Sequence, residues 1–159
     1  MLFIFDLDGT VIDSSHRQLT RADGSLDLTH WVRNNTPEKI AADTLLPLAA
    51  SWKTINRKRD QIAIMTARVI GKNDIKFLRD NGLEYDYIYS RAFGDTTPDD
   101  ILKKRMIFRL RFDMKKSLNW LRHNSYMFDD NNSVRQCLTG LGIRCYNPTN
   151  YNTQNKEIL

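Results

Sequence analysis

Two aspartates, Asp6 and Asp8, stand two residues apart directly after the apolar run 2–5, and Gly9 follows them. A carboxylate can attack phosphorus and form an aspartyl-phosphate. A second carboxyl group that points elsewhere from the same loop can protonate the leaving oxygen and later activate water. Gly9 allows a sharp backbone turn and leaves room for a phosphate. These residue types in this order can carry out phosphoryl-group hydrolysis, with one aspartate as the nucleophile and the other in proton transfer.

Polar residues also follow two other apolar segments of the chain. Thr66 comes directly after residues 61–65, and the pair Asp129 and Asp130 comes after residues 125–128. Each has an alternative structural interpretation, since threonine can cap a helix and acidic residues favour the N-terminus of a following helix. With Asp6 present, metal binding is the preferred interpretation of Asp129 and Asp130, whereas for Thr66 the capping role and a functional role can hold at once.

Four carboxylates gathered at one place repel one another unless a cation lies among them. Asp6, Asp8, Asp129 and Asp130 would form such a group if their strands were neighbours. Ligands that are all oxygen atoms suit a hard ion, and Mg²⁺ binds through few carboxylates while it accepts phosphate oxygens as further ligands. The sequence therefore predicts a Mg²⁺ site.

The elements that must position these side chains are strands that alternate with helices. Five buried strands are predicted, over residues 2–5, 61–65, 85–89, 125–128 and 143–146. Helices are predicted from Pro37 to about residue 55 with a break at Pro47, over 72–81, from Pro98 onward, over 115–122, and around Val134 and Leu138. This alternation predicts a three-layer α/β domain with a mostly parallel sheet. In such sheets ligands bind beyond the carboxyl ends of the strands.

Length and composition predict one globular domain over residues 1–159. Apolar residues make up 41% and charged residues 27% of the chain, which argues against a disordered or membrane-embedded protein. Two cysteines, Cys137 and Cys145, are too few for a disulfide framework. No signal sequence or apolar segment of membrane-spanning length is evident, which predicts a cytoplasmic protein. The net charge of +5 fits ordinary solubility or attraction of a phosphorylated substrate.

The segments quoted above resemble the motifs of the haloacid dehalogenase-like (HAD) phosphohydrolases. Asp6-Leu7-Asp8-Gly9-Thr10 resembles the first motif, Thr66 the second, Lys103 or Lys104 the third and the pair Asp129-Asp130 the fourth. All four occur in the family's order and span nearly the whole chain. The resemblance implies a Rossmann-like fold and catalysis with Mg²⁺.

The resemblance also implies a role for each matching residue. Asp6 would be nucleophile and metal ligand, and Asp8 would be general acid and base, with its backbone carbonyl on the metal. Thr66 would hydrogen-bond the phosphoryl group, and Lys103 would neutralise charge between Asp6 and the phosphoryl oxygens. Asp129 would bind Mg²⁺, and Asp130 would do so directly or through water.

A narrower resemblance is to the 3′-phosphatase module of bacteriophage-type polynucleotide kinases. It rests on Thr66-Ala67-Arg68, on Gly94-Asp95-Thr96 before Asp99-Asp100-Ile101-Leu102-Lys103, and on Asp129-Asp130 leading to Gly142-Ile143. This register selects Lys103 as the third-motif lysine, with Lys104 as the alternative, and places Arg68 at the substrate phosphate. The residues expected to contact substrate are Gly9, Thr10, Ala67, Arg68 and Lys104. Asn131 departs from the pattern, because that subgroup is expected to have arginine there.

Residues 14–36 occupy the place where the HAD family carries a cap over the site, and at this length we expect a small lid. Trp31 within it either packs or stacks on a base. From residue 147 onward the asparagine-rich tail has no periodicity and is expected to be loose.

Three functions are compatible with these residues. The preferred one is hydrolysis of the 3′-phosphate of nucleic-acid ends or of nucleotides. The alternatives are a 5′-mononucleotidase or small-molecule phosphatase, and a non-catalytic nucleic-acid-binding module. The absence of a Gly-x-x-x-x-Gly-Lys-Ser/Thr motif argues against kinase activity. The expected partner is a phosphorylated nucleotide or nucleic-acid end, with neither a membrane nor an obligate protein partner.

Overall fold

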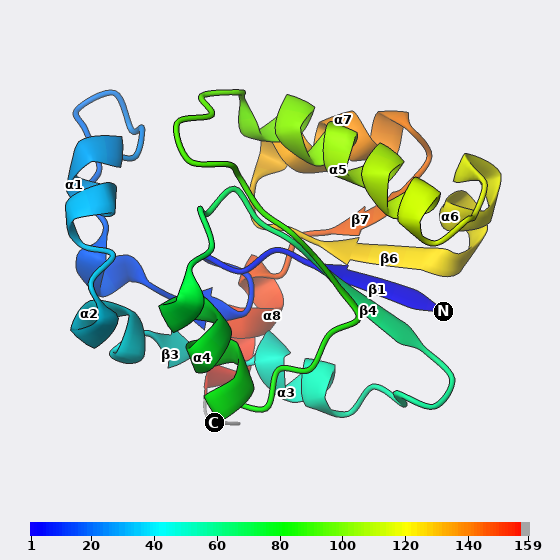
Figure 1. Cartoon of the computed structure of the whole chain (residues 1–159), viewed down its shortest axis with the longest axis horizontal. Coiled ribbons are helices and arrows are strands. Elements are labelled where there is room, and N and C mark those ends of the chain that lie inside the picture. The colour runs from blue at the N-terminus through cyan, green and yellow to red at the C-terminus, as the bar shows by residue number, and fades with distance from the viewer. Residues whose placement is uncertain (157–159) are drawn as a thin grey trace.

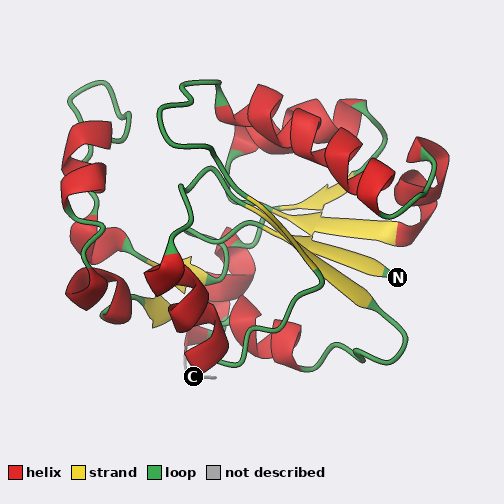
Figure 2. Ribbon diagram, in the orientation of Figure 1, coloured by secondary structure: helices red, strands yellow, loops and turns green. Residues whose placement is uncertain are grey.

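The computed structural model describes residues 1–156 and is built on one five-stranded parallel sheet (Figures 1 and 2). The strand order is β5-β4-β1-β6-β7, with every neighbouring pair parallel. The strands are β1 (Leu2–Phe5), β4 (Gln61–Met65), β5 (Tyr87–Tyr89), β6 (Ser125–Phe128) and β7 (Arg144–Tyr146). The predicted three-layer α/β architecture is therefore confirmed, and all five predicted strands are present.

Helices cover both faces of this sheet, which is why its central strands are mostly apolar. One face packs against α5 (Asp99–Asp113), α6 (Leu118–Asn124) and α7 (Asn132–Gly140). The other packs against α2 (Pro37–Ala41), α3 (Leu48–Lys53) and α4 (Lys72–Asp80). Alternate residues of β4 serve the two cores: Ala63 faces the α5 side, and Ile62 and Ile64 face the α3 side.

A second, two-stranded sheet was not predicted. Its antiparallel strands are β2 (Ile12–Asp13) and β3 (Thr44–Leu45), and β3 interrupts the helix that was expected to run from residue 37 to 55. The expected break at Pro47 is present, since α3 begins directly after it. Two residues are too few to produce a strand pattern in the sequence, so β3 depends on its partner β2.

Residues 14–43 connect β2 to β3, and we call them the insert. The insert contains a short 3₁₀ helix, η1 (Ser15–Arg17), then α1 (Leu28–Arg33) and α2. It extends to one side of the main sheet (Figure 1). Its carboxyl-terminal boundary lies several residues beyond residue 36, where the segment was expected to end.

The expectation of a loose tail from residue 147 is wrong for the described part. Residues Thr149–Gln154 form α8, and residues 157–159 lie outside the described part of the chain. The side chain of Asn152 is buried; its Oδ1 accepts from Leu48 N at 2.9 Å and its Nδ2 donates to Thr10 O at 2.9 Å. The sequence of this helix shows no apolar periodicity. Its attachment to the rest of the domain uses the polar side chain of Asn152 instead.

The helix predicted over residues 115–122 starts later than expected. Lys115 adopts a left-handed backbone conformation with φ of 54°, which a right-handed helix cannot include. Ser117 then caps α6 by accepting a hydrogen bond from Trp120 N. Among residues 1–156, no helix combines the length and apolar character needed to cross a membrane.

We predict that Asn152→Ala lowers the free energy of unfolding by about 2 kcal/mol, because it removes two buried hydrogen bonds and leaves two backbone groups without partners. Urea unfolding of the purified protein measures this change. Asn150→Ala is the matched control, since Asn150 is exposed on the same helix, and we expect it to change stability by less than about 0.5 kcal/mol. Equal effects of the two substitutions would contradict the anchoring role of Asn152.

Candidate active site

Three predicted site residues are the first residues after neighbouring strands, and each is positioned by a backbone hydrogen bond that continues the sheet. Asp6 N donates to Phe128 O at 3.0 Å, Thr66 N to Tyr89 O at 3.0 Å and Asp129 N to Tyr146 O at 3.2 Å. Since β4, β1 and β6 are adjacent, the three side chains emerge at one edge of the sheet. This is the convergence that the sequence predicted.

Asp6 is buried, with 6% of its surface exposed, and makes an ion pair with Lys103 at 2.9 Å. Burial raises the pKa of Asp6, and the Lys103 charge opposes that shift. The nearby carboxylates of Asp129, Asp130 and Asp8 raise it further, so the pKa of Asp6 lies well above its usual range. A group of negative charges is therefore only partly compensated by the one ammonium group.

Lys103 lies on the buried side of α5, with 2% of its surface exposed. Its Nζ donates to Asp129 Oδ2 at 2.6 Å as well as contacting Asp6. Burial lowers the pKa of Lys103, but the charges of Asp6 and Asp129 outweigh it and hold the pKa above its ordinary value. Lys104 is exposed on the same helix. Of the two lysines considered from the sequence, the structure brings Lys103 to the acidic group.

Carboxylate oxygens of Asp6, Asp129 and Asp130 lie within 4.8 Å of one another. Gly9 adopts φ of +71°, and a Cβ atom there would overlap the Asp130 carboxylate, so this close approach requires glycine. Three carboxylates beside one ammonium leave surplus negative charge, and an all-oxygen set of donors suits Mg²⁺. These residues therefore fit the predicted metal. The Asp8 side chain does not belong to this group.

The helix-capping alternative for Asp129 and Asp130 does not describe their contacts. The N-cap of α7 is Asn131, whose side-chain oxygen accepts from Ser133 N at 3.0 Å. Asp129 Oδ1 instead accepts from Asn131 N at 2.9 Å, which leaves Oδ2 for Lys103. The residue that departed from the expected subgroup pattern thus orients one of the candidate metal ligands.

Asp8 forms an ion pair with a different cation, Arg68. Arg68 Nε donates to Asp8 Oδ2 at 3.1 Å, Arg68 Nη2 donates to Asp8 Oδ1, and Ser14 Oγ donates to Oδ1 at 2.5 Å. Burial would raise the pKa of Asp8, but the charge and hydrogen bonds of Arg68, with the Ser14 hydroxyl and the Arg17 charge, hold it below its usual value. The Asp8 carboxylate form is therefore favoured.

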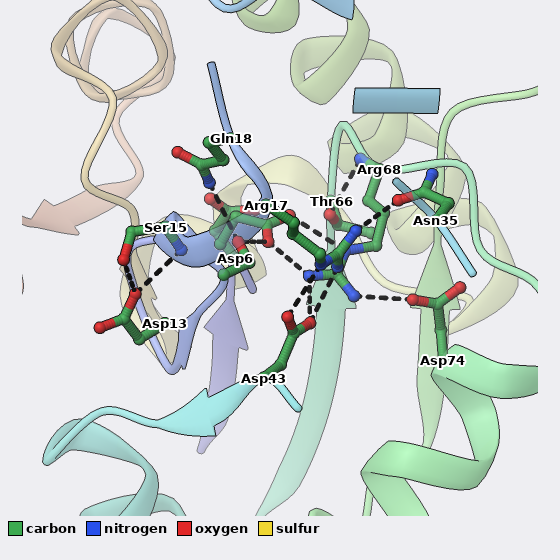
Figure 3. Close-up of polar contacts among 12 residues, drawn as sticks. Asp6, Asp13, Ser15, Arg17, Gln18, Asn35, Asp43, Thr66, Arg68 and Asp74 are labelled. Atoms are coloured by element: carbon green, nitrogen blue, oxygen red, sulfur yellow. Dashed lines mark hydrogen bonds and ion pairs between the residues drawn. The ribbon is translucent and has the colours of Figure 1, made fainter. Parts of the chain in front are cut away.

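Arg68 was predicted to contact the substrate phosphate, and the structure gives it other contacts. It is buried, and its guanidinium also donates to Asp74 Oδ1 at 2.7 Å and to Asp43 Oδ2 at 3.4 Å. Three carboxylates therefore contact this one cation: Asp8 from the loop after β1, Asp43 from the insert and Asp74 from α4. Figure 3 shows Asp43 and Asp74 beside Arg68. Asp43 and Asp74 were not identified from the sequence, where they carry no motif.

Within the insert, a second buried arginine, Arg17, holds the Asp43 carboxylate that contacts Arg68. Arg17 Nε and Nη2 donate to the two carboxylate oxygens of Asp43, each at 2.8 Å, and Arg17 Nη1 donates to Asn35. The Arg17 guanidinium carbon lies 4.2 Å from the centre of the Trp31 ring. Trp31 is 8% exposed, so it packs in the structure, and its ring contacts a guanidinium group.

The remaining predicted substrate contacts lie on the same loops. Thr66 is buried, and its Oγ1 accepts from Arg68 N at 3.0 Å, which shapes the loop after β4. Ala67 O accepts from Arg91 Nε at 3.0 Å. Thr10 is buried, and among residues 1–156 its hydroxyl has no hydrogen-bond partner. These contacts fix the loop backbones around Asp6 and Asp8.

The fold is shared with several solved structures, which include hydrolases of the HAD superfamily. A chain of the Pnkp1/Rnl/Hen1 complex matches with a TM-score of 0.66 and 21% identity, over 92% of this chain and 44% of that one. A HAD-superfamily hydrolase from Geobacter sulfurreducens matches with a TM-score of 0.62 and 14% identity, over 91% of this chain and 86% of that one. A haloacid dehalogenase-like hydrolase from Streptococcus pneumoniae matches with a TM-score of 0.61 and 13% identity, over 91% of this chain and 82% of that one. The predicted HAD fold is confirmed.

Sequence comparison leads to one family within that superfamily. The 5′-deoxynucleotidase of Escherichia phage T5 is 37% identical over 86 residues, which make up 52% of this chain and 35% of that protein. The match thus spans about a third of the relative's length. The family model described as Bacteriophage T5 5′-deoxynucleotidase matches residues 1–156. The chain therefore belongs to the Bacteriophage T5 5′-deoxynucleotidase family of HAD-fold proteins.

Proposed function

We propose that this protein is a Mg²⁺-dependent phosphatase that hydrolyses 5′-mononucleotides through an aspartyl-phosphate on Asp6. The observation that carries this proposal is the group formed by Asp6, Lys103 and Asp129, with Asp130 beside it and Asp8 on the same loop. It combines a carboxylate nucleophile, a buried cation and an oxygen-rich metal site. The family match supports a 5′-deoxynucleotide as substrate.

The reaction would proceed in two steps at Asp6. A carboxylate oxygen of Asp6 attacks phosphorus, the bond from phosphorus to the nucleoside 5′-oxygen breaks, and Asp8 gives that oxygen a proton. Water then attacks the aspartyl-phosphate, Asp8 takes the proton from that water, and inorganic phosphate leaves with Asp6 restored. A bound phosphate dianion beside Asp8 raises its pKa, because a like charge disfavours the carboxylate. Bound substrate would thus oppose the lowering of the Asp8 pKa by Arg68.

Lys103 and the bound metal ion would both neutralise negative charge at Asp6 and the phosphoryl oxygens. The ammonium group contacts Asp6 directly, so it is placed to compensate charge between the nucleophile and the phosphoryl oxygens. Asp6, Asp129 and Asp130 would hold Mg²⁺, with the backbone carbonyl of Asp8 as the further ligand expected from the HAD family. When bound, Mg²⁺ supplies a Lewis acid for the phosphoryl oxygens.

The 3′-phosphate of a nucleic-acid end remains a prediction from the sequence. The match to a chain of the Pnkp1/Rnl/Hen1 complex concerns the fold, at 21% identity. The family description names a 5′-deoxynucleotidase, which favours the alternative of a 5′-mononucleotidase. Both substrates would use the same Asp6 chemistry, so a substrate comparison distinguishes them.

We predict that 5′-deoxymononucleotides are hydrolysed with a kcat/KM about tenfold or more above that of a 3′-phosphorylated oligonucleotide. Phosphate release with Mg²⁺ measures both. Asp6→Asn keeps the side-chain shape and removes the nucleophile, so we expect it to lower kcat by about 1,000-fold or more. A preference for the oligonucleotide would support the 3′-phosphatase prediction instead. Unchanged turnover in Asp6→Asn would refute the mechanism.

Adjacent lysines allow a paired test of the buried cation. We expect Lys103→Met to lower kcat by about 100-fold or more, because it removes the charge that contacts Asp6. Lys104→Met changes an exposed side chain one residue away, and we expect an effect of about twofold or less. Steady-state kinetics and circular dichroism of both variants provide the readout. The assignment of Lys103 fails if the two variants lose activity equally.

Chelation of divalent metal should abolish hydrolysis, and added Mg²⁺ should restore it. We predict that Asp130→Asn raises the Mg²⁺ concentration needed for half-maximal activity by about tenfold or more, because a ligand charge is lost. Asp80→Asn, at an exposed position on α4, is the control and should leave that concentration unchanged. The Mg²⁺-dependent rise in melting temperature gives a second readout, independent of turnover. Full activity after chelation would exclude the metal site.

A further inference from the structure

A pocket of about 300 Å³ lies beside residues 6–10, which we call the catalytic loop, and is not used by the chemistry described so far. Its walls come from the catalytic loop, from β2 and the start of the insert, from Leu46, and from α8 with Lys156 after it. The lining residues are Gly9, Asp13, Ser14, Ser15, Gln18, Leu46, Thr149, Asn152, Thr153 and Lys156. Gly9 belongs to the loop that carries Asp6 and Asp8, so the pocket borders the candidate phosphate site. The described end of the chain thus contributes to a cavity next to the reacting groups.

Hydrogen bonds connect the wall of this pocket to Asp8. Ser14 Oγ donates to Asp8 Oδ1 at 2.5 Å, and Gln18 Nε2 donates to Ser14 Oγ at 3.0 Å. Both Ser14 and Gln18 line the pocket. In the proposed reaction Asp8 protonates the leaving oxygen, so the leaving group lies on the Asp8 side of the phosphorus. Since Ser14 both contacts Asp8 and lines the pocket, the pocket lies one side chain away from the group that would protonate the leaving oxygen.

The lining side chains offer both donors and acceptors. Ser15 N and Oγ donate to Asp13 Oδ1 at 3.0 and 2.6 Å, and these bonds hold the pKa of Asp13 below its usual value. Lys156 contributes a positive charge from the other side of the pocket, and Thr149 and Thr153 contribute hydroxyl groups. Leu46 adds an apolar wall. A sugar with a heteroaromatic base presents this combination of polar edges and apolar faces.

The size of the pocket limits the choice of occupant. A volume of about 300 Å³ is at the lower end of cavities that hold small organic ligands. One nucleoside matches this scale better than several linked nucleotides do. A single nucleoside is also the leaving group of a 5′-mononucleotide.

We propose that this pocket binds the sugar and base of a 5′-mononucleotide, with Asp13, Thr153 and Lys156 as the contacting side chains. The inference rests on the proposed phosphatase function. It assigns the leaving group to a cavity formed mainly by the start of the insert and by α8. It gives α8 a role in substrate recognition in addition to its attachment through Asn152.

The test fills the pocket with a bulky side chain from α8. Thr153→Trp places an indole at a lining position, and Asn150→Trp places the same group at an exposed position of α8 that does not line the pocket. We compare a 5′-deoxymononucleotide with acetyl phosphate, whose leaving group is too small to reach across the pocket. In Thr153→Trp we expect the KM for the nucleotide to rise by about tenfold more than that for acetyl phosphate. Asn150→Trp should show no such difference.

A binding measurement makes the result independent of turnover. A deoxynucleoside without phosphate is titrated into the parent protein and both tryptophan variants by isothermal calorimetry. We expect it to bind the parent and Asn150→Trp and to bind Thr153→Trp about tenfold or more weakly. If no phosphate ester is hydrolysed but the nucleoside still binds in this pattern, the phosphatase proposal fails and the pocket stands. Equal nucleoside binding by all three proteins, or equal KM changes for both substrates, would overturn the pocket assignment.

Discussion

The Lys103 ammonium group lies between Asp6 and Asp129, and the burial of these two carboxylates depends on it. Removing two carboxylates from water is costly unless a cation and hydrogen bonds compensate them. The cation comes from α5, whose apolar side packs on the sheet through Leu102 and Met106 on either side of Lys103 in sequence. The packing of α5 on the sheet therefore also positions the cation on which the site depends.

A second charge centre serves the other aspartate of the catalytic loop. The Arg68 guanidinium forms ion pairs with Asp8, Asp43 and Asp74, whereas Asp6 forms its ion pair with Lys103. The two environments shift the pKa values of Asp6 and Asp8 in opposite directions. The two aspartates thus lie in different electrostatic environments although they are two residues apart. A raised pKa for the nucleophile and a lowered pKa for the general acid are the reverse of what the proposed roles need, so bound Mg²⁺ would have to lower the pKa of Asp6 and bound phosphate would have to raise that of Asp8. Because Asp43 belongs to the insert, the position of the insert is coupled to Asp8.

The strands and the residues at their ends could be predicted because their signals are local. Apolar runs such as 2–5 and 61–65 identify buried strands, and the parallel order then brings Asp6 and Thr66 to one edge. Lys103 could be distinguished from Lys104 only by the register of a family resemblance. The structure separates the two because adjacent residues of a helix point about 100° apart.

Other features arise from contacts between distant parts of the chain and have no local pattern. Asp43 and Asp74 look like ordinary surface acids in the sequence, yet both bind Arg68. The short strand β3 exists through its pairing with β2, and α8 is attached by the side chain of Asn152. Periodicity cannot identify such elements, since their stabilising partners are far away in the sequence.

The bond from Asn152 to Thr10 O joins two residues that are 142 positions apart. The catalytic loop is synthesised before α8, and the two are separated by these 142 positions. A nascent chain on the ribosome thus carries Asp6 and Asp8 without this contact while the residues between them and α8 are added. The order of synthesis therefore delays completion of the catalytic loop until α8 has emerged and docked.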